Sequence, residues 1–410
     1  MREAYLTADL PGIGGELRHK HEDFEVEELP LYAPCGEGEH VFVRIRKRGL
    51  STFEVVRRVA RDLRIPERWV SYAGLKDARA VAWQWLSIHG VDPEAVASLR
   101  YKYIHIDRVA RHTNRLKIGH LRGNRFRLRV HDCHPDARER ARAILDVLVR
   151  RGAPNFFGEQ RFGIRADGHL IGESLLRRDY EEFVHRLLGG PSELEKDQRL
   201  GESRRLFDAG RLEEAYEAMP LTRRMEKKSL HALIRFDDYE RAYFAVPKRM
   251  RQMFASAYQS HLFNRIVTER LDELDRIKQD ELAYLHHNGA VFVVEDVARE
   301  QERCRAFEIS PSGPIFGTKV SIAGGEVGEI ERRILADAHL TPESFDVGGG
   351  MRLRGLRRSL RIPLRNVVID KVSAESVRIE FLLPPGAFAT SVMREIMKDD
   401  KGKGPQQRLN

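Results

Sequence analysis

The sequence has only three cysteines in 410 residues, Cys35, Cys133 and Cys304. An odd number of widely spaced cysteines excludes a complete disulfide framework and is typical of reduced thiols in a reducing compartment. No apolar run approaches the roughly 18 residues that a membrane span needs. The N-terminus also lacks the charged-then-apolar pattern of a signal peptide. We therefore expect a cytoplasmic protein with no membrane association.

Cofactor-binding motifs are also missing from the sequence. It has no Gly-Lys-Ser/Thr phosphate loop, and the glycines of segment 12–15 lack the preceding strand and the following long helix of a dinucleotide loop. The run His131-Asp132-Cys133-His134 contains metal-capable side chains, but its spacing fits no common zinc pattern and no second ligand pair follows. We predict a protein that uses neither a cofactor nor a metal.

Positive charge is in modest excess, with 71 Lys and Arg against 62 Asp and Glu, a formal net charge of +9. This excess favours a polyanionic partner without demanding one. The chain is long enough for two or three hydrophobic cores, and two domains are the default expectation.

The most informative stretch spans residues 71–80. Gly74 marks a loop, and the alternating apolar residues after it predict a strand that includes Val81, Trp83 and Trp85. Asp77 lies at the junction, between Lys76 and Arg79. These positive charges favour the ionised carboxylate, as a nucleophile or general base requires. A solvated surface triplet has the same spacing, and the charges alone do not separate the two interpretations.

A second pattern places three arginines on one face of a predicted strand. Arg125, Arg127 and Arg129 alternate with apolar residues, and a period of two sends them to the same side. Such a face is either a solvated outer surface or a surface that contacts phosphates. Arg111 and Lys117 in the basic segment before it favour phosphate contact nearby.

The stretch Ala73-Gly74-Leu75-Lys76-Asp77 resembles the active-site segment of the TruD family of pseudouridine synthases, in which this Asp is the catalytic carboxylate. Four more stretches resemble family segments, and they follow the family's order. They are 21–28 (HEDFEVEE), 155–163 (NFFGEQRFG), 257–264 (AYQSHLFN) and 381–390 (FLLPPGAFAT).

The resemblance implies an enzyme that isomerises a uridine of tRNA, expected at position 13, to pseudouridine without a cofactor. Asp77 would be catalytic, either attacking C1′ or removing a proton from C2′. The substrate-binding residues implied are Phe24, Lys76, Asn155, Phe157 and Phe388. Residues expected to contact RNA are Arg111, Lys117, Arg125, Arg127, Arg129 and Arg161, although Arg161 also fits a role in bracing its loop. The expected partner is tRNA, and no obligate protein partner is evident.

Several alternatives stay open at this point. Phenylalanines in such a loop usually belong to a hydrophobic core. The same chemistry could act on another tRNA position or another RNA, or the chain could bind RNA without catalysis. An RNA methyltransferase is disfavoured because a Gly-rich cofactor loop is missing.

The resemblance implies an α+β fold with two domains, and the change of composition after about residue 180 is consistent with it. Residues 1–180 and 363–410 would form a discontinuous catalytic domain with a mixed, mainly antiparallel sheet, and residues 181–362 an inserted α/β TRUD domain. Residues 398–410 lack an apolar period and are expected to form a disordered tail.

Overall fold

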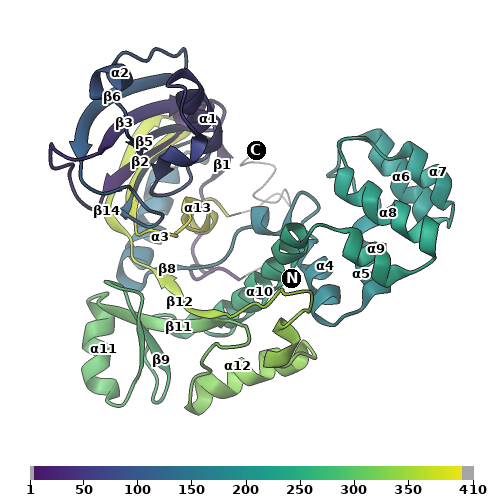
Figure 1. The fold of residues 1–410 in the computed structure, drawn as a ribbon. Coiled ribbons are helices and arrows are strands. Elements are labelled where there is room, and N and C mark those ends of the chain that lie inside the picture. Colours follow the sequence, from purple (N-terminus) through teal and green to yellow (C-terminus); the bar gives the residue numbers. More distant parts are fainter. Residues whose placement is uncertain (1–3, 399–410) are drawn as a thin grey trace. The chain divides into compact units, whose positions relative to one another are not determined.

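The structure is a computed structural model that describes residues 4–398 (Figure 1). The chain divides into two compact units. We call residues 5–153 and 362–398 the sheet unit, and residues 154–361 the inserted unit. The predicted tail lies outside the described residues except for Lys398, which is buried and donates hydrogen bonds to the carbonyls of Thr7 and Leu10.

The sheet unit is built on a nine-stranded sheet whose main path runs β14-β15-β7-β2-β5-β3-β6, with β1 on β7 and β4 on β5. Every pairing is antiparallel except β2 with β5. This confirms the predicted mixed, mainly antiparallel sheet and the α+β class. The strands are β1 Gly14–Leu17, β2 Phe24–Pro30, β3 His40–Arg48, β4 Val70–Tyr72, β5 Val81–His89, β6 Ile104–His112, β7 Leu121–Cys133, β14 Arg365–Ser373 and β15 Ser376–Leu383.

The two ends of the chain meet in this sheet. Strand β15 pairs along β7, from Val377 opposite Val130 to Leu383 opposite Asn124, so yellow strands lie among purple and blue ones in Figure 1. Helices α3 (Ala137–Arg151) and α13 (Ala389–Met397) bury their apolar faces in the core that these strands share. Alternating apolar residues on β7 and β15 therefore make a core that the two chain segments form together.

A second core lies under β3, β5 and helix α1 (Thr52–Asp62). Helix α1 begins with the predicted capping box, in which Ser51 and Glu54 satisfy each other's backbone N–H groups. Helix α2 (Pro93–Ala97) follows β5. The capped helix matters for the site because its first residue, Thr52, contacts the loop that carries Asp77.

The inserted unit combines helices with a four-stranded sheet of order β10-β9-β11-β12. Two-residue strands, β8 (Ala153–Pro154) and β13 (Arg361–Ile362), occur where the chain passes between the units. The other strands are β9 Leu282–Leu285, β10 Val291–Val293, β11 Ile309–Ile315 and β12 Leu356–Ser359. The helices are α4 Gly168–Leu176, α5 Tyr180–Leu188, α6 Gln198–Asp208, α7 Leu212–Ala218, α8 Arg224–Phe236, α9 Tyr239–Ala245, α10 Lys248–Glu269, α11 Val297–Arg305 and α12 Gly325–Asp337.

The inserted unit begins earlier in the chain than the sequence indicated. Residues 154–180 belong to it, whereas the prediction assigned them to the first domain. The cause is the close packing of α4 on α10, where a Cβ at Gly172 would meet the carbonyl oxygen of Phe254 at 2.1 Å. The later boundary, between 361 and 362, is one residue from the expected position. The assignment of catalytic and TRUD domains to these units stays a prediction.

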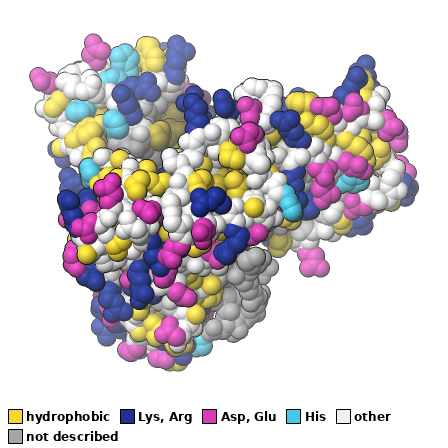
Figure 2. Space-filling model, turned by 90° about the horizontal axis from the view of Figure 1, so that it is seen from below, with side chains coloured by type: hydrophobic (Ala, Val, Ile, Leu, Met, Phe, Trp, Pro, Cys, Tyr) yellow, Lys and Arg dark blue, Asp and Glu magenta, His cyan; other side chains and the backbone are white. Residues whose placement is uncertain are grey.

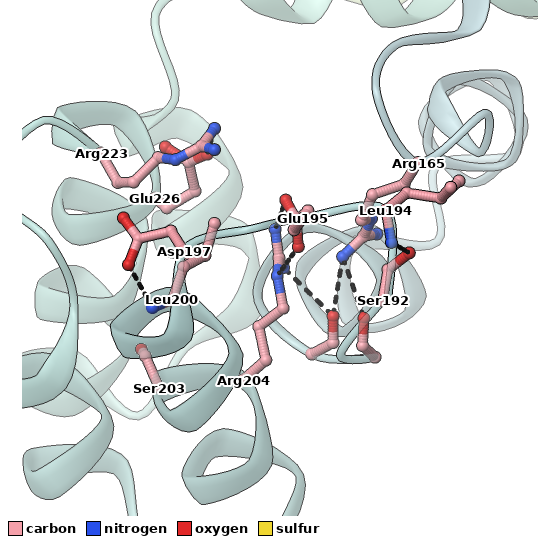
Figure 3. A network of polar contacts seen from close by, with 12 residues as sticks. Arg165, Ser192, Leu194, Glu195, Asp197, Leu200, Ser203, Arg204, Arg223 and Glu226 are labelled. Carbon is pink, nitrogen blue, oxygen red and sulfur yellow. Dashed lines mark hydrogen bonds and ion pairs between the residues drawn. The ribbon is translucent and has the colours of Figure 1, made fainter. Parts of the chain in front are cut away.

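Buried arginines hold the segment between α5 and α6 (Figure 3). Arg204 forms an ion pair with Glu195 at 2.7 Å and donates to the carbonyls of Leu187 and Gly189. Arg165 donates to the Gly189 carbonyl from the other side. These charges are fully used within the fold, so we assign them a structural role.

Charges of both signs share the surface. On the face in Figure 2, Lys and Arg side chains lie interspersed with Asp and Glu. None of the helices in residues 4–398 combines the length and the apolar character that crossing a membrane requires.

Candidate functional site

Asp77 lies on the loop between β4 and β5, and about half of its side chain is exposed. The loop backbone is fixed from several directions. Gln84 on β5 donates to the Gly74 carbonyl at 2.6 Å, and the Lys76 amide donates to Thr52 Oγ1 at 3.0 Å. Thr52 in turn donates to the Gln84 side-chain oxygen. The carboxylate is therefore reachable from solvent while its supporting backbone is held in the core.

The ion-pair partner of Asp77 is Arg18, which follows β1. Its Nη2 lies 3.3 Å from Asp77 Oδ2, and its side chain is only 7% exposed. The guanidinium also stacks over the Phe24 ring, 4.1 Å from the centroid. Burial lowers the pKa of Arg18, and the Asp77 charge opposes this shift. An arginine stays protonated under these conditions, so it can orient the Asp77 carboxylate.

Lys76 does not contact Asp77 through its ammonium group. Its Nζ lies 2.6 Å from Glu28 Oε2, and both side chains are almost fully buried, at 4% and 1% exposure. The other oxygen of Glu28 accepts the Trp85 amide. Burial raises the pKa of Glu28, although Lys76 acts against this shift. Lys76 was predicted to lie beside the Asp77 charge, but its ammonium pairs with Glu28, and Arg18 is the residue that pairs with Asp77. Substrate contact by Lys76 stays a prediction.

The two phenylalanines predicted to shape the pocket lie in different environments. Phe24 is 2% exposed and packs edge-on against Phe126 in the core. Its link to Asp77 is the Arg18 guanidinium on its ring. Phe388, the N-cap of α13, is 47% exposed. Of the pair, only Phe388 has a ring with much free surface.

Asn155, in the inserted unit, uses both ends of its amide within the fold. Its Nδ2 donates to the Ser359 carbonyl at 2.8 Å, and its Oδ1 accepts from Arg358 at 2.5 Å. The side chain is buried. These contacts favour a bracing role, and the base contact that the resemblance implies stays a prediction.

Phe157 is partly exposed, and both its backbone N–H and its backbone carbonyl are hydrogen-bonded to one side chain. The Asn264 side chain accepts from its N–H at 2.8 Å and donates to its carbonyl at 3.0 Å. Its ring meets Phe263 edge-on, and the Arg358 guanidinium lies 4.5 Å from its centroid. Burial lowers the pKa of Arg358 to about 10, so it stays charged at neutral pH. Phe157 is thus presented as a rigid aromatic group.

Arg161 connects the Phe157 loop to α10. Its Nε donates to Ser260 Oγ at 3.0 Å, its Nη2 donates to Ser256, and its guanidinium lies 5.7 Å from the Phe157 centroid. This geometry fits the bracing role considered for Arg161. Its contact with RNA stays a prediction.

Two of the three arginines of β7, Arg125 and Arg127, form ion pairs across the sheet. Arg125 lies opposite Glu27 on β2, and Arg127 lies opposite both Glu25 on β2 and Glu380 on β15. Their ion-pair distances run from 3.0 to 3.8 Å. Arg129 donates to Ser376. Neighbouring carboxylates therefore offset most of this positive charge, which favours the surface interpretation over phosphate contact.

The other predicted RNA contacts differ in exposure. Arg111 is partly buried and donates to the Gly38 carbonyl at 3.3 Å. Lys117 is exposed on the loop before β7. Lys117 has the freer cationic group for a phosphate, and both contacts stay predictions.

One group of residues within 4–398 has side chains placed as metal ligands are. Glu16, His19 and Asp132 each offer a ligand atom within 4.8 Å of the others, and all three are exposed. Only Asp132 comes from the 131–134 run considered above. His19 Nε2 lies 3.4 Å from Glu16 and 3.6 Å from Asp132. The imidazole already bridges the two carboxylates, so this trio carries no metal assignment.

Arg18, Glu28, Lys47 and Arg358 were not predicted from the sequence to belong to the site. Glu28 and Lys47 do carry a readable signal. Glu28 follows Phe24 and Val26 at intervals of two, and Lys47 continues the inward series of β3, so each is a charged residue at a buried strand position. Arg18 has no such signal, because it lies among the charged residues of a short loop.

A half-exposed carboxylate held by a buried guanidinium, beside a mainly antiparallel sheet, is an arrangement that suits a nucleophile or a base. Comparison with known proteins names the kind of enzyme. The model of the family tRNA pseudouridine synthase D (TruD) matches residues 1–396. The chain belongs to this TruD family.

Individual relatives agree along the whole length. The chain is 47% identical over 399 residues to tRNA pseudouridine synthase D of Geobacter metallireducens, covering 96% of this chain and 97% of that protein. It is 44% identical over 395 residues to the protein of the same name from Geotalea daltonii, covering 96% and 99%. A crystal structure of the candidate tRNA pseudouridine synthase D (TruD) of Methanosarcina mazei superimposes with a TM-score of 0.85 at 27% identity, covering 98% and 97%.

Proposed function

We propose that this enzyme isomerises a uridine of tRNA to pseudouridine, at position 13, with Asp77 as the catalytic carboxylate. The observation that carries the proposal is the Arg18–Asp77 pair, which joins a half-exposed carboxylate to a buried guanidinium on a fixed loop. Membership of the TruD family supplies the reaction class. We expect the enzyme to act in the cytoplasm, without a cofactor and without an obligate protein partner.

The reaction breaks the bond between N1 and C1′, turns the uracil and joins C5 to C1′. Asp77 starts it in one of two ways: it attacks C1′ as a nucleophile, or it takes the proton from C2′ as a base. Both routes need an ionised carboxylate, and the Arg18 guanidinium lies 3.3 Å from Asp77 Oδ2. The target nucleotide must leave its stack to reach the carboxylate, which costs a few kcal/mol.

The remaining predicted residues would offset this cost. Phe157 is proposed to stack on the target base, because a rigid aromatic ring can replace the stacking lost on flipping. Phe388 and Phe24 are proposed to shape the pocket, Phe24 acting through Arg18. Lys117 is proposed to contact a phosphate. Phosphate contacts of this kind would contribute to tRNA affinity but would not discriminate between nucleotide sequences.

The experiment incubates purified protein with unmodified tRNA transcripts and maps pseudouridine at every uridine. We expect one modified position, position 13. Pseudouridine at a different position would support the proposed reaction but contradict position 13 as its target. Tight binding with no pseudouridine at any position would contradict the proposal and leave an RNA-binding protein.

We expect Phe157→Ala to weaken productive tRNA binding without unfolding the protein. Loss of base stacking is worth roughly 1 to 3 kcal/mol, or about 5- to 150-fold. The measurements are the pseudouridine rate at limiting enzyme and the melting temperature of the same sample.

Phe263→Ala is the matched control, because Phe263 touches the same ring but is fully buried. Its truncation should cost about 3 to 5 kcal/mol of stability. If Phe157→Ala instead lowers the melting temperature as much as Phe263→Ala and keeps its activity below that temperature, Phe157 is a core residue.

A further inference from the structure

The side-chain amine of Lys47 contacts the backbone of the loop that carries Asp77. It lies on β3, opposite Ala82 of β5, and continues the inward series Val41, Val43 and Ile45. Its side chain is fully buried. The pattern of the strand calls for an apolar residue at this position, so the lysine needs another explanation.

All of the hydrogen-bonding capacity of this amine goes to backbone carbonyls. Nζ lies 2.5 Å from the Leu50 oxygen, 3.3 Å from the Lys76 oxygen and 2.7 Å from the Asp77 oxygen. An ammonium group has three N–H donors. Two of the three therefore hold consecutive peptide groups of the loop, including that of the residue with the catalytic carboxylate.

The stability of the fold does not account for this lysine. Taking an ammonium group out of water costs several kcal/mol, and an apolar side chain of similar volume avoids that cost. Burial lowers the pKa of Lys47 to about 8. The neighbouring Lys76 charge acts in the same direction, and the Asp77 and Glu54 charges act against it. Lys76 is itself paired with Glu28. A residue that is costly for the fold but is attached to the catalytic loop points to a role in the reaction.

We propose that Lys47 is a positioning residue for Asp77, clamping the carbonyls of residues 76 and 77 so that the carboxylate meets the nucleotide at a fixed height and angle. This inference rests on the proposed function, because it assigns the clamp to the same reaction. Arg18 orients the carboxylate of Asp77 by an ion pair, and Lys47 fixes the backbone of the same loop by hydrogen bonds to its carbonyls. A misplacement of about 1 Å at a reacting group can cost about 10²-fold in rate.

Deprotonation of Lys47 should affect the clamp and the stability of the fold in opposite directions. A neutral amine has two N–H groups for three carbonyls, so the clamp weakens as pH rises through about 8. The pKa of Lys47 in the folded protein lies below its ordinary value of 10.5, so between these values the unfolded chain binds more protons. The contribution of this group to stability therefore rises over the same window. If Lys47 had only a structural role, its deprotonation would not lower the reaction rate while the protein stayed folded.

The test compares Lys47→Met with the wild type under single-turnover conditions, with Lys102→Met as the exposed control. We expect the Met variant to lose about 10²-fold in the isomerisation rate, to keep its tRNA affinity within about threefold, and to stay folded at the assay temperature. Lys102→Met should match the wild type in all three. A rate for Lys47→Met within about threefold of wild type would overturn the proposal.

A pH series on the wild type covers the case in which Lys47→Met does not fold. We expect its single-turnover rate to fall reversibly above pH of about 8, and a flat rate to pH of about 9.5 would overturn the clamp. The two proposals fail separately. If the wild type forms no pseudouridine, the proposed function is wrong, whereas an active wild type with an equally active Lys47→Met removes only the role of Lys47.

Discussion

Replacing Asp77 with Asn is expected to abolish pseudouridine formation while leaving the fold and tRNA binding in place. The amide can neither attack C1′ nor take a proton from C2′, so both routes stop. The Asp77 side chain is 49% exposed, and the Asn side-chain oxygen can still accept a hydrogen bond from the Arg18 guanidinium, so the melting temperature should change little. Affinity should stay within a few fold because phosphate contacts supply most of it. The measurements are single-turnover pseudouridine formation, filter binding of tRNA and thermal melting.

Asp107→Asn is the matched control for this variant. Asp107 is also an exposed aspartate of the sheet unit that pairs with an arginine, Arg44, at 2.6 Å. We expect it to keep wild-type activity. Substantial turnover by Asp77→Asn, or an equal loss in both variants, would contradict the role given to Asp77.

The second large effect is expected on stability, from Lys76→Met. This change leaves Glu28, which is 1% exposed, without its ion-pair partner. Breaking a buried pair by removing one member costs about 3 to 5 kcal/mol because the remaining charge is uncompensated. The free energy of unfolding from urea titration should fall by that amount, with unfolding monitored by circular dichroism.

Two further variants separate the buried pair from a general effect of losing a positive charge. Arg48→Met removes a pair of the same length on the surface, to Glu22, and should leave the unfolding midpoint where it is. Adding Glu28→Gln to Lys76→Met removes the uncompensated charge while keeping an acceptor for the Trp85 amide, so part of the loss should return. A loss below about 1 kcal/mol for Lys76→Met would mean that the pair acts like a surface pair.

Local patterns predicted the loop-to-strand junction that carries Asp77, and the resemblance to the TruD family implied the class of fold. The alternating apolar residues after Gly74 predicted strand β5, and the capping box at Ser51 predicted the start of α1. The partners of the key residues could not be read in the same way. Arg18 lies 59 residues before Asp77, and a left-handed φ of 68° turns the chain at that point. Their contact depends on how β1 and the loop are brought together by the sheet.

The arginine face of β7 is a second case in which local pattern was insufficient. Period two correctly put Arg125, Arg127 and Arg129 on one side, but their charge balance depends on cross-strand register. Glu380, opposite Arg127, lies 253 residues away in the sequence. The strand alone fitted a solvated surface as well as a phosphate-binding one, and the basic segment before it favoured phosphate contact. The sheet, however, supplies its own carboxylates.

The most direct test of the account is made in cells that lack this protein and are complemented with either the wild type or Asp77→Asn at equal abundance. Pseudouridine is mapped at single-nucleotide resolution across the cellular tRNA. The account predicts that pseudouridine at position 13 disappears without the protein, returns with the wild type and stays absent with Asp77→Asn. Restoration by Asp77→Asn, or no loss of pseudouridine without the protein, would contradict it.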